Sequence, residues 1–348
     1  MFMIMWTKNC FYTLLIYFLT SVNLLSQSKE GLQIEEEINY SAVKEHTKKC
    51  ADTRSTGCMI VFKGEIIDEW YTDSIESADK VQIKTRSAVK SWVSLLTGIL
   101  MEQGKIDLDD PVSKYIPKWK AGADSGITVR HLLTMTSGLK QRLVSEMRTG
   151  GLPVIQSADN QNAFAFSMPL TYSPGERWSY SNEGVQLLSP ILEQAAGIPL
   201  YEFAEKYLFN TLDMKDTRLM IDDFGNTVTY AGATTTVSDF AKIGQLILNK
   251  GKWKGEQIIS ENTIKLFTTP IPQMKNYGYL WWIDEKTGSV AAMGSQDNVC
   301  VIFPDLDLIV VRMQKESYPD GNGNWMSPET INMLRTIVSG SGEITTQE

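Results

Sequence analysis

A serine placed three residues before a lysine is the pattern in this sequence with the clearest chemical use. A serine hydroxyl becomes a nucleophile when a neighbouring base takes its proton, and lysine can be that base if burial or nearby charge lowers its pKa. The pattern occurs five times, beginning at Ser26, Ser41, Ser77, Ser87 and Ser137. The sequence around each match has to decide which of them, if any, is catalytic.

The segment that follows Ser87 predicts a buried helix. Apolar residues recur at one-turn spacing, and Gly104 stands where such a helix would end: Val89, Trp92, Val93, Leu96, Ile99 and Leu100. Ser87 and Lys90 would lie one turn apart at the helix start, where free N–H groups and the helix dipole favour a developing negative charge. Ser87 is therefore the candidate nucleophile and Lys90 its candidate base, with a simple helix N-cap as the alternative role for the serine.

The matches at Ser41 and Ser137 lack this setting. Charged residues follow Ser41 at positions 45–49, so Lys44 is expected to be solvated and protonated. Gly138 directly follows Ser137 and favours a turn, which would leave the lysine of that match without a fixed direction.

A second polar segment, "YSPGERWSYSNEGVQLL", lies about ninety residues further along. A Pro-Gly turn precedes Tyr180 and Asn182, and an apolar helix is predicted after them. A tyrosine phenol can relay protons beside a lysine ammonium, and an asparagine amide can orient a substrate amide or the lysine itself. An ordinary helix-start loop with a packed tyrosine is the alternative.

Composition bounds the class of protein. The chain has 348 residues, 43% of them hydrophobic and 21% charged, which is enough for one large domain or two modest ones. The net charge of −8 and the lack of a basic run argue against a nucleic-acid partner. The apolar stretch after Lys8 predicts a signal peptide over residues 1–27, and hence export to the periplasm or medium with no membrane span after its removal.

The cysteines and histidines are few. In an oxidising compartment Cys50 and Cys58 are the most plausible disulfide pair, because only seven residues separate them. Cys300 lies in an apolar run and is expected to be a buried strand residue. With two histidines, His46 and His131, and no C-x-x-C or H-x-x-x-H pattern, we predict no metal site and no cofactor.

Two groups of strand-like segments enclose a helical region. A hairpin is predicted around Lys63-Gly64, and strands are predicted in "YGYLWWI", "SVAAM", "NVCVIFP" and "LDLIVVRM". We expect an α+β fold of the α/β sandwich type: a mostly antiparallel sheet flanked by helices, with an inserted helical lobe. The predicted limits are a polar lead-in and polar surface helix over 28–54, one main domain over 55–340 and a tail over 341–348. Sheet segments lie at about 55–86 and 269–340, helices at about 87–268, and a final helix at about 327–339.

The segments "TRSAVKSWVSLLTGILMEQGKIDLDDPVSKYIPKW", "ITVRHLLTMTSGL", "YSPGERWSYSNEGVQLL", "YGYLWWI" and "VCVIFPDLDLIVV" resemble the serine β-lactamase-like hydrolases. The likeness runs in order over about residues 55–338 and is strongest to the branch with class C β-lactamases, penicillin-recognising esterases, D-aminopeptidases and 6-aminohexanoate-dimer hydrolases. It implies a β-lactamase/transpeptidase-like fold and an acyl-enzyme on Ser87. It also implies that Lys90 activates the serine, Tyr180 transfers a second proton, Asn182 positions the substrate and the Ser87 N–H helps to hold the oxyanion.

The third motif of that family departs from the pattern. Family members usually have Lys-Thr-Gly, His-Thr-Gly or Gly-His-Gly-Gly on the strand that lines the site, whereas this chain has Gly294, Ser295, Gln296, Asp297 and Asn298 there. A backbone donor from this stretch could still bind the oxyanion or substrate. The missing cation would weaken the grip on a substrate carboxylate, and Asp297 would repel one if it faced the site.

These residues predict an exported serine hydrolase that acts on a small-molecule ester or amide or on a peptide, such as a carboxylester, a 6-aminohexanoate-type amide or a D-amino-acid amide. A β-lactamase or D-Ala-D-Ala carboxypeptidase is an alternative within the same chemistry. A catalytically weakened homologue that binds cell-wall peptides or a protein partner is an alternative from another class. The motifs specify neither the acyl group nor the oligomeric state.

Overall fold

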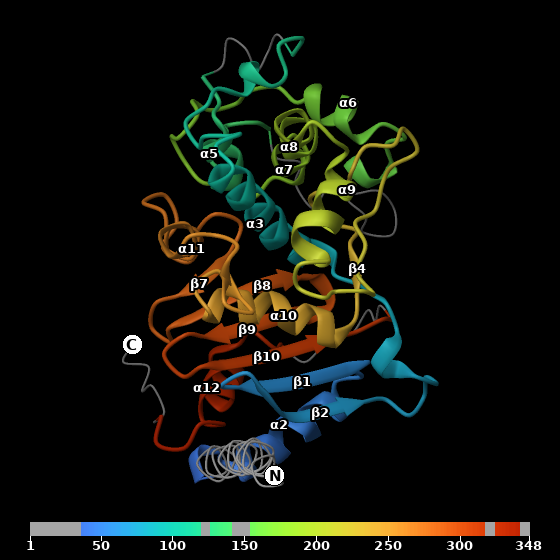
Figure 1. The fold of residues 1–348 in the computed structure, drawn as a ribbon, viewed down its shortest axis with the longest axis vertical. Coiled ribbons are helices and arrows are strands. Elements are labelled where there is room, and N and C mark those ends of the chain that lie inside the picture. The colour runs from blue at the N-terminus through green and yellow to red at the C-terminus, as the bar shows by residue number, and fades with distance from the viewer. Residues whose placement is uncertain (1–35, 120–125, 141–153, 317–323, 342–348) are drawn as a thin grey trace, which may run out of the picture.

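The computed structural model describes residues 36–119, 126–140, 154–316 and 324–341, and the predicted signal peptide lies outside them. Its centre is a six-stranded antiparallel sheet with the strand order β2-β1-β10-β9-β8-β7. The strands are β1 (Gly57–Phe62), β2 (Glu65–Tyr71), β7 (Trp282–Asp284), β8 (Ser289–Gly294), β9 (Asn298–Phe303) and β10 (Leu308–Met313). The first two and the last four strands therefore meet through the β1–β10 pair, as the α+β prediction requires (Figure 1).

The hairpin predicted at Lys63-Gly64 joins β1 to β2. Both turn residues have positive φ, 50° for Lys63 and 82° for Gly64. Two positive φ angles in a two-residue loop match the right-handed twist of the flanking strands, and glycine accepts this conformation without steric cost.

Each face of the sheet is covered by helices. Along β10, Ile309 and Val311 belong to the core under α3 (Val89–Glu102) and α10 (Val237–Leu248), whereas Leu308 and Val310 belong to a second core. The second core lies beneath α2 (Tyr40–Asp52) and α12 (Pro328–Arg335). This alternation follows from the two-residue period of a strand, and it accounts for the near-continuous apolar runs in the sequence.

The inserted helical lobe lies above the sheet in Figure 1, and α3 runs between the two. Two short strand pairs lie outside the main sheet: β3 (Ile83–Lys84) with β4 (Thr234–Thr235), and β5 (Lys252–Trp253) with β6 (Glu256–Gln257). Among the described residues, the further α-helices are α5 (Val129–Leu133), α6 (Gln161–Phe166), α7 (Asn182–Gln186), α8 (Leu188–Ala196), α9 (Leu200–Ala204) and α11 (Glu261–Phe267).

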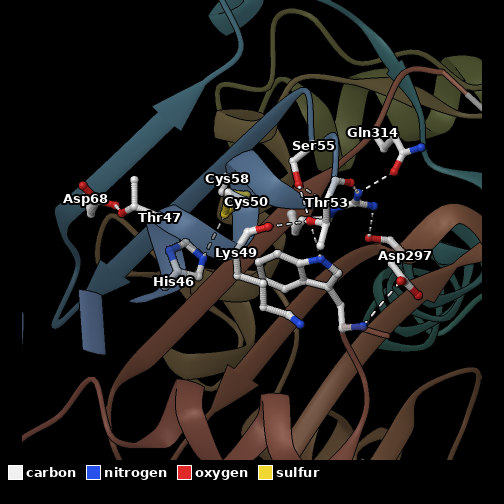
Figure 2. The surroundings of a disulfide bond; sticks show 12 residues. His46, Thr47, Lys49, Cys50, Thr53, Ser55, Cys58, Asp68, Asp297 and Gln314 are labelled. Atoms are coloured by element: carbon white, nitrogen blue, oxygen red, sulfur yellow. Dashed lines mark hydrogen bonds between the residues drawn. A yellow bond between two sulfur atoms is a disulfide. The ribbon is translucent and has the colours of Figure 1, made fainter. Parts of the chain in front are cut away.

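The N-terminal helix α2 is largely polar and lies at the surface, as its sequence predicts, but one of its faces is buried. One narrow stripe, made of Ala42, Val43, His46 and Cys50, is buried against the sheet. The sequence shows no wide apolar face here because the stripe is narrow and includes a histidine. The predicted disulfide between Cys50 and Cys58 is present and joins this helix to β1 (Figure 2).

His46, Cys50 and Cys58 offer ligand atoms within 4.8 Å of one another. Because the two sulfurs are bonded to each other, this group leaves one imidazole nitrogen and no thiolate for a metal ion. Cys300 is buried in β9 as a free thiol, which confirms its predicted strand position.

Two further details differ from the sequence pattern. The segment "YGYLWWI" predicts one strand, but only its end enters β7, because Tyr277 to Leu280 form a turn in which Leu280 has a φ of 66°. The final helix is present and starts after Ser327, whose hydroxyl accepts a hydrogen bond from the Thr330 N–H. Within the described ranges, no helix has both the length and the apolar character needed to cross a bilayer.

Candidate active site

Ser87 lies in a single 3-10 turn, η2 (Arg86–Ala88), directly before α3. Its hydroxyl makes no capping hydrogen bond at the start of the helix, so the N-cap alternative does not describe its role. Arg86 has a φ of 55°, a conformation that is costly for a residue other than glycine and that turns the chain sharply before the serine. Ser87 is half-buried, and its hydroxyl oxygen lies 3.1 Å from the amine of Lys90.

Lys90 is enclosed by protein. Its side chain is 2% exposed, and its amine donates one hydrogen bond to Ser87 Oγ and another to the carbonyl oxygen of Tyr230. Burial lowers the pKa of this amine, and the charges of Tyr180 and Glu183 act against that shift. A lysine in this setting can exist as the free base that the serine proton requires.

Tyr180 completes this group from a distant part of the chain. The Lys90 amine lies 4.9 Å from the centre of its ring. The ring stacks on Trp282 of β7, with centroids 6.5 Å apart, and meets the edge of Trp178. These aromatic contacts hold the phenol beside the amine, so Ser87, Lys90 and Tyr180 converge as the sequence predicts.

Asn182 follows as the first residue of α7. The preceding residue, Ser181, caps this helix by accepting a hydrogen bond from the Gly184 N–H at 2.9 Å, which fixes where the helix begins. Asn182 is half-buried, and its Oδ1 has no hydrogen-bond partner among the described residues. This amide oxygen is itself buried, two residues after Tyr180, and such an orphaned acceptor is uncommon in a folded protein.

Two residues that the sequence did not single out support the lysine. Glu183 is 3% exposed, and its charge acts on both Lys90 and Tyr230. Gln186 is fully buried; its amide donates to the Thr227 carbonyl and accepts from the Thr229 N–H, which holds the segment that presents the Tyr230 carbonyl to Lys90. Both lie on the helix after Asn182, but nothing in their spacing indicated that polar residues there would be buried.

The end of β8 lies against the nucleophile turn. A Cβ on Gly294 would be 2.1 Å from the Thr85 carbonyl oxygen and 3.2 Å from the Ala88 nitrogen, so only glycine permits this approach. The turn that follows, η7 (Ser295–Asp297), contains Gln296 at a φ of 68° and Asp297 at 49°.

The predicted third-motif residues divide into two groups. Ser295 is exposed and Gln296 is half-buried, at the turn beside η2. The side chain of Asn298 is fully buried: it donates to the Lys84 carbonyl and accepts from the Gln314 N–H, so it braces the turn and is not presented to a ligand. The Asp297 carboxylate accepts from the Trp325 N–H on the side of the disulfide, and its charge acts on Lys49.

None of the rival serine matches within the described residues has a buried lysine, and Ser26 lies outside those residues. Ser41 and Lys44 are both exposed on α2, as expected, and Ser77 is exposed too. Ser137 is buried, and Gly138 after it has a φ of 76° and forms a turn, again as expected.

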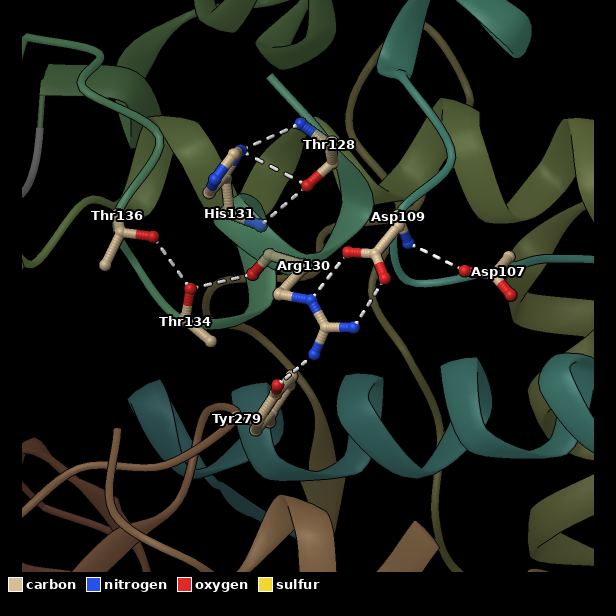
Figure 3. A network of polar contacts seen from close by, with 8 residues as sticks. All are labelled: Asp107, Asp109, Thr128, Arg130, His131, Thr134, Thr136 and Tyr279. Atoms are coloured by element: carbon tan, nitrogen blue, oxygen red, sulfur yellow. Dashed lines mark hydrogen bonds and ion pairs between the residues drawn. The ribbon is translucent and has the colours of Figure 1, made fainter. Parts of the chain in front are cut away.

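Neither histidine reaches Ser87 as part of a triad. His131 caps α5, since its Nδ1 accepts from the Thr128 N–H at 3.1 Å and its own N–H donates to Thr128 Oγ1 (Figure 3). Its neighbour Arg130 binds both carboxylate oxygens of Asp109, at 2.7 and 2.8 Å, and contacts Tyr279. This network ties the helical lobe to the segment before β7.

The chain resembles several characterised proteins in sequence. It is 23% identical over 292 residues to a 6-aminohexanoate-dimer hydrolase from Paenarthrobacter ureafaciens, which covers 76% of this chain and 73% of that one. Esterase EstB from Burkholderia gladioli is 31% identical over 144 residues, or 37% of this chain and 36% of the esterase.

The fold also matches known structures. A penicillin binding protein from Bacillus halodurans aligns with a TM-score of 0.65 and 18% identity, over 78% of this chain and 95% of that one. The family model described as Beta-lactamase matches residues 80–327, a stretch that includes Ser87, Lys90, Tyr180 and the third-motif turn. The chain therefore belongs to the beta-lactamase family.

Proposed function

We propose that this protein is a serine hydrolase that forms an acyl-enzyme on Ser87 and cleaves an ester or amide. The observation that carries the proposal is the buried Lys90 amine, 3.1 Å from the serine oxygen and beside the ring of Tyr180. Burying an amine costs stability that burying an apolar side chain of similar size would not cost. Packing alone therefore does not account for Lys90.

The reaction would proceed in two halves. Lys90 takes the Ser87 proton while Ser87 Oγ bonds to the substrate carbonyl carbon, and the backbone N–H of Ser87 stabilises the oxyanion. The bond to the leaving group then breaks, Tyr180 gives its proton to the departing oxygen or nitrogen, and the Lys90 ammonium returns a proton to Tyr180. Water next attacks the acyl carbon and gives one proton to the neutral Lys90 amine. The bond to Ser87 Oγ then breaks, and that proton passes from Lys90 to Ser87 Oγ as the acid leaves. Asn182 Oδ1 would accept a hydrogen bond from a substrate N–H.

Neutral substrates are favoured over those with a carboxylate beside the reacting bond. Residues 294–298 at the end of β8 carry no lysine, arginine or histidine, so this strand lacks the cation that would hold a carboxylate. Since the Asp297 carboxylate faces Trp325 and Lys49, we do not expect it to repel a substrate directly. Short esters and unactivated amides are the proposed class, ahead of β-lactams and D-Ala-D-Ala peptides.

Covalent labelling tests the function directly. A fluorophosphonate probe should label the wild-type protein, and Ser87→Ala should abolish labelling while Ser41→Ala, which changes an exposed serine of the same motif, should not. A panel of a chromogenic cephalosporin, nitrophenyl esters, D-amino-acid amides and an aminohexanoate dimer would then define the substrate. Folded protein without labelling or turnover would instead support a homologue that binds cell-wall peptides or a protein partner.

We also propose that the protein is exported. The Cys50–Cys58 disulfide supports this, because such bonds persist mainly in oxidising compartments. Mass determination of the protein from the periplasm or medium should show a chain shortened near residue 27. A full-length chain retained in the cytoplasm would contradict export.

A further inference from the structure

Arg312 is a buried cation near the end of an otherwise apolar strand. It lies on β10 and is fully buried. Its five N–H groups all donate to neutral oxygens: Ser55 Oγ, the Thr53 carbonyl, Gln314 Oε1 and the carbonyls of Gln296 and Asp297. A buried guanidinium without a direct carboxylate partner costs stability, so its presence here needs an explanation beyond packing.

Two of its acceptors belong to the turn after β8. Gln296 and Asp297 both have positive φ angles, 68° and 49°, which residues with side chains rarely adopt. Such a strained turn persists only where its surroundings fix it. The guanidinium does this by binding the carbonyl oxygens of both residues with one nitrogen, Nη1.

This turn continues directly into the nucleophile's surroundings. Gly294 at its start is in backbone contact with Thr85, and Asn298 at its end donates a hydrogen bond to the Lys84 carbonyl at 3.1 Å. The turn is therefore fastened on one side to the residues just before Ser87 and on the other to Arg312.

The opposite side of Arg312 is anchored as firmly. Ser55 accepts from Nε at 2.9 Å and the Thr53 carbonyl from Nη2 at 3.0 Å. Both belong to the short loop that the Cys50–Cys58 disulfide closes, and Figure 2 shows Thr53 and Ser55 between the disulfide and the pair Gln314 and Asp297. A covalently restrained loop thus supports the guanidinium on the face of the sheet away from α3.

We propose that Arg312 is a positioning residue for the active site. Arg312 holds the turn after β8 in the position in which this turn contacts the residues before Ser87. It touches neither the nucleophile nor the lysine, and acts through Gln296 and Asp297. This inference rests on the proposed hydrolase function and adds to it a residue outside the family motifs, together with the disulfide loop that supports it.

Arg335 supplies a matched control. It is also a buried arginine, 7% exposed, and it binds the Thr287 carbonyl and Asp305. These contacts lie at the opposite end of β8, which is about 17 Å from Gly294 at roughly 3.3 Å per residue. Arg312→Met and Arg335→Met should both lower the melting temperature, whereas only Arg312→Met should disturb the active site.

The test measures kcat and KM for an active ester, the rate of fluorophosphonate labelling, and hydrogen exchange of the peptides that contain residues 84–88 and 294–298. Arg312→Met should lower kcat by about 100-fold, the effect of a displacement near 1 Å, with a smaller change in KM, and should speed exchange in both peptides. Arg312→Lys, with three donors, should restore part of the rate, and it replaces the methionine variant if that variant does not fold. Arg335→Met should keep wild-type kcat and exchange.

Wild-type kcat in a folded Arg312 variant, or equal losses in the Arg312 and Arg335 variants, would overturn the inference. A wild-type protein without turnover or labelling would instead refute the proposed function. Hydrogen exchange separates the two failures: unchanged exchange at residues 84–88 in the Arg312 variant overturns the positioning role whatever the activity.

Discussion

Replacing Gly294 with alanine would test how tightly the site is assembled. Gly294 has extended backbone angles, φ −122° and ψ 157°, which alanine adopts without strain. The effect of the added methyl group therefore comes from contact alone. That methyl carbon would stand 2.1 Å from the Thr85 carbonyl oxygen and 3.0 Å from the Cβ of Arg86.

The size of the effect follows from this contact. To reach even 3.0 Å from the Thr85 oxygen, the new carbon must move away by about 0.9 Å, and backbone lies on both sides of the contact. Either the turn before Ser87 or the end of β8 has to shift. A displacement of about 1 Å in catalytic groups can cost about 100-fold in rate, which corresponds to about 2.7 kcal/mol of transition-state stabilisation.

The assay is kcat/KM for the best ester of the substrate panel, together with the rate of fluorophosphonate labelling. Gly104→Ala is the control, because Gly104 follows the same helix that carries Lys90, has a φ of 66°, and has nothing within 4 Å of an added Cβ. It should cost about 1 kcal/mol of stability and leave the rate unchanged. A Gly294→Ala protein with wild-type kcat/KM would refute the view that this contact sets the nucleophile's position.

Four further predictions concern the active site, a buried histidine and the disulfide. Activity should fall as pH drops, with a midpoint below the usual lysine pKa of 10.5, because burial lowers the pKa of Lys90 and only its neutral amine can accept the serine proton. Lys90→Met and Tyr180→Phe should each lower turnover by about 10²–10⁴-fold without loss of folded protein by circular dichroism. An unchanged rate in either variant would remove that residue from the mechanism. Burial lowers the pKa of His46 from 6.5 to about 4, so the unfolded chain binds a proton that the folded chain does not as pH falls through this range. The free energy of unfolding measured with urea should therefore fall by about 3 kcal/mol between pH 6.5 and pH 4 in the wild type, and this loss should be missing in His46→Gln. The same pH dependence in that variant would contradict this origin. Reduction of the Cys50–Cys58 bond should lower the free energy of unfolding by about 2.5 kcal/mol, the chain entropy of a loop this short, and a Cys50→Ala/Cys58→Ala protein that still responded to reductant would count against it.

Much of the local structure could be predicted because it depends on neighbours in the sequence. The period of the apolar residues after Ser87 predicted α3, and Lys63-Gly64 predicted a hairpin that the structure contains. The Cys50–Cys58 pair was predictable for a similar reason, since a short separation keeps the two thiols close in any compact state.

Polar burial was not predictable in the same way. The sequence predicted His46 on a polar surface helix, but its side chain is fully buried. The burial of Glu183 and Gln186 near Lys90 was not predicted from the sequence. Whether a polar side chain is buried depends on which distant element covers it, and its own neighbours carry no information about that element.

The sequence by itself determined the chemistry that is available: a serine and a lysine one helical turn apart, a tyrosine and asparagine at a second helix start, and no cation in the third motif. Only the tertiary structure decided whether that chemistry is assembled. The Tyr230 carbonyl that meets Lys90, the Thr85 carbonyl that requires glycine at position 294, and the guanidinium of Arg312 all come from segments far away along the chain. Contacts of this kind are fixed by strand pairing and helix packing across the whole domain, which no local pattern encodes.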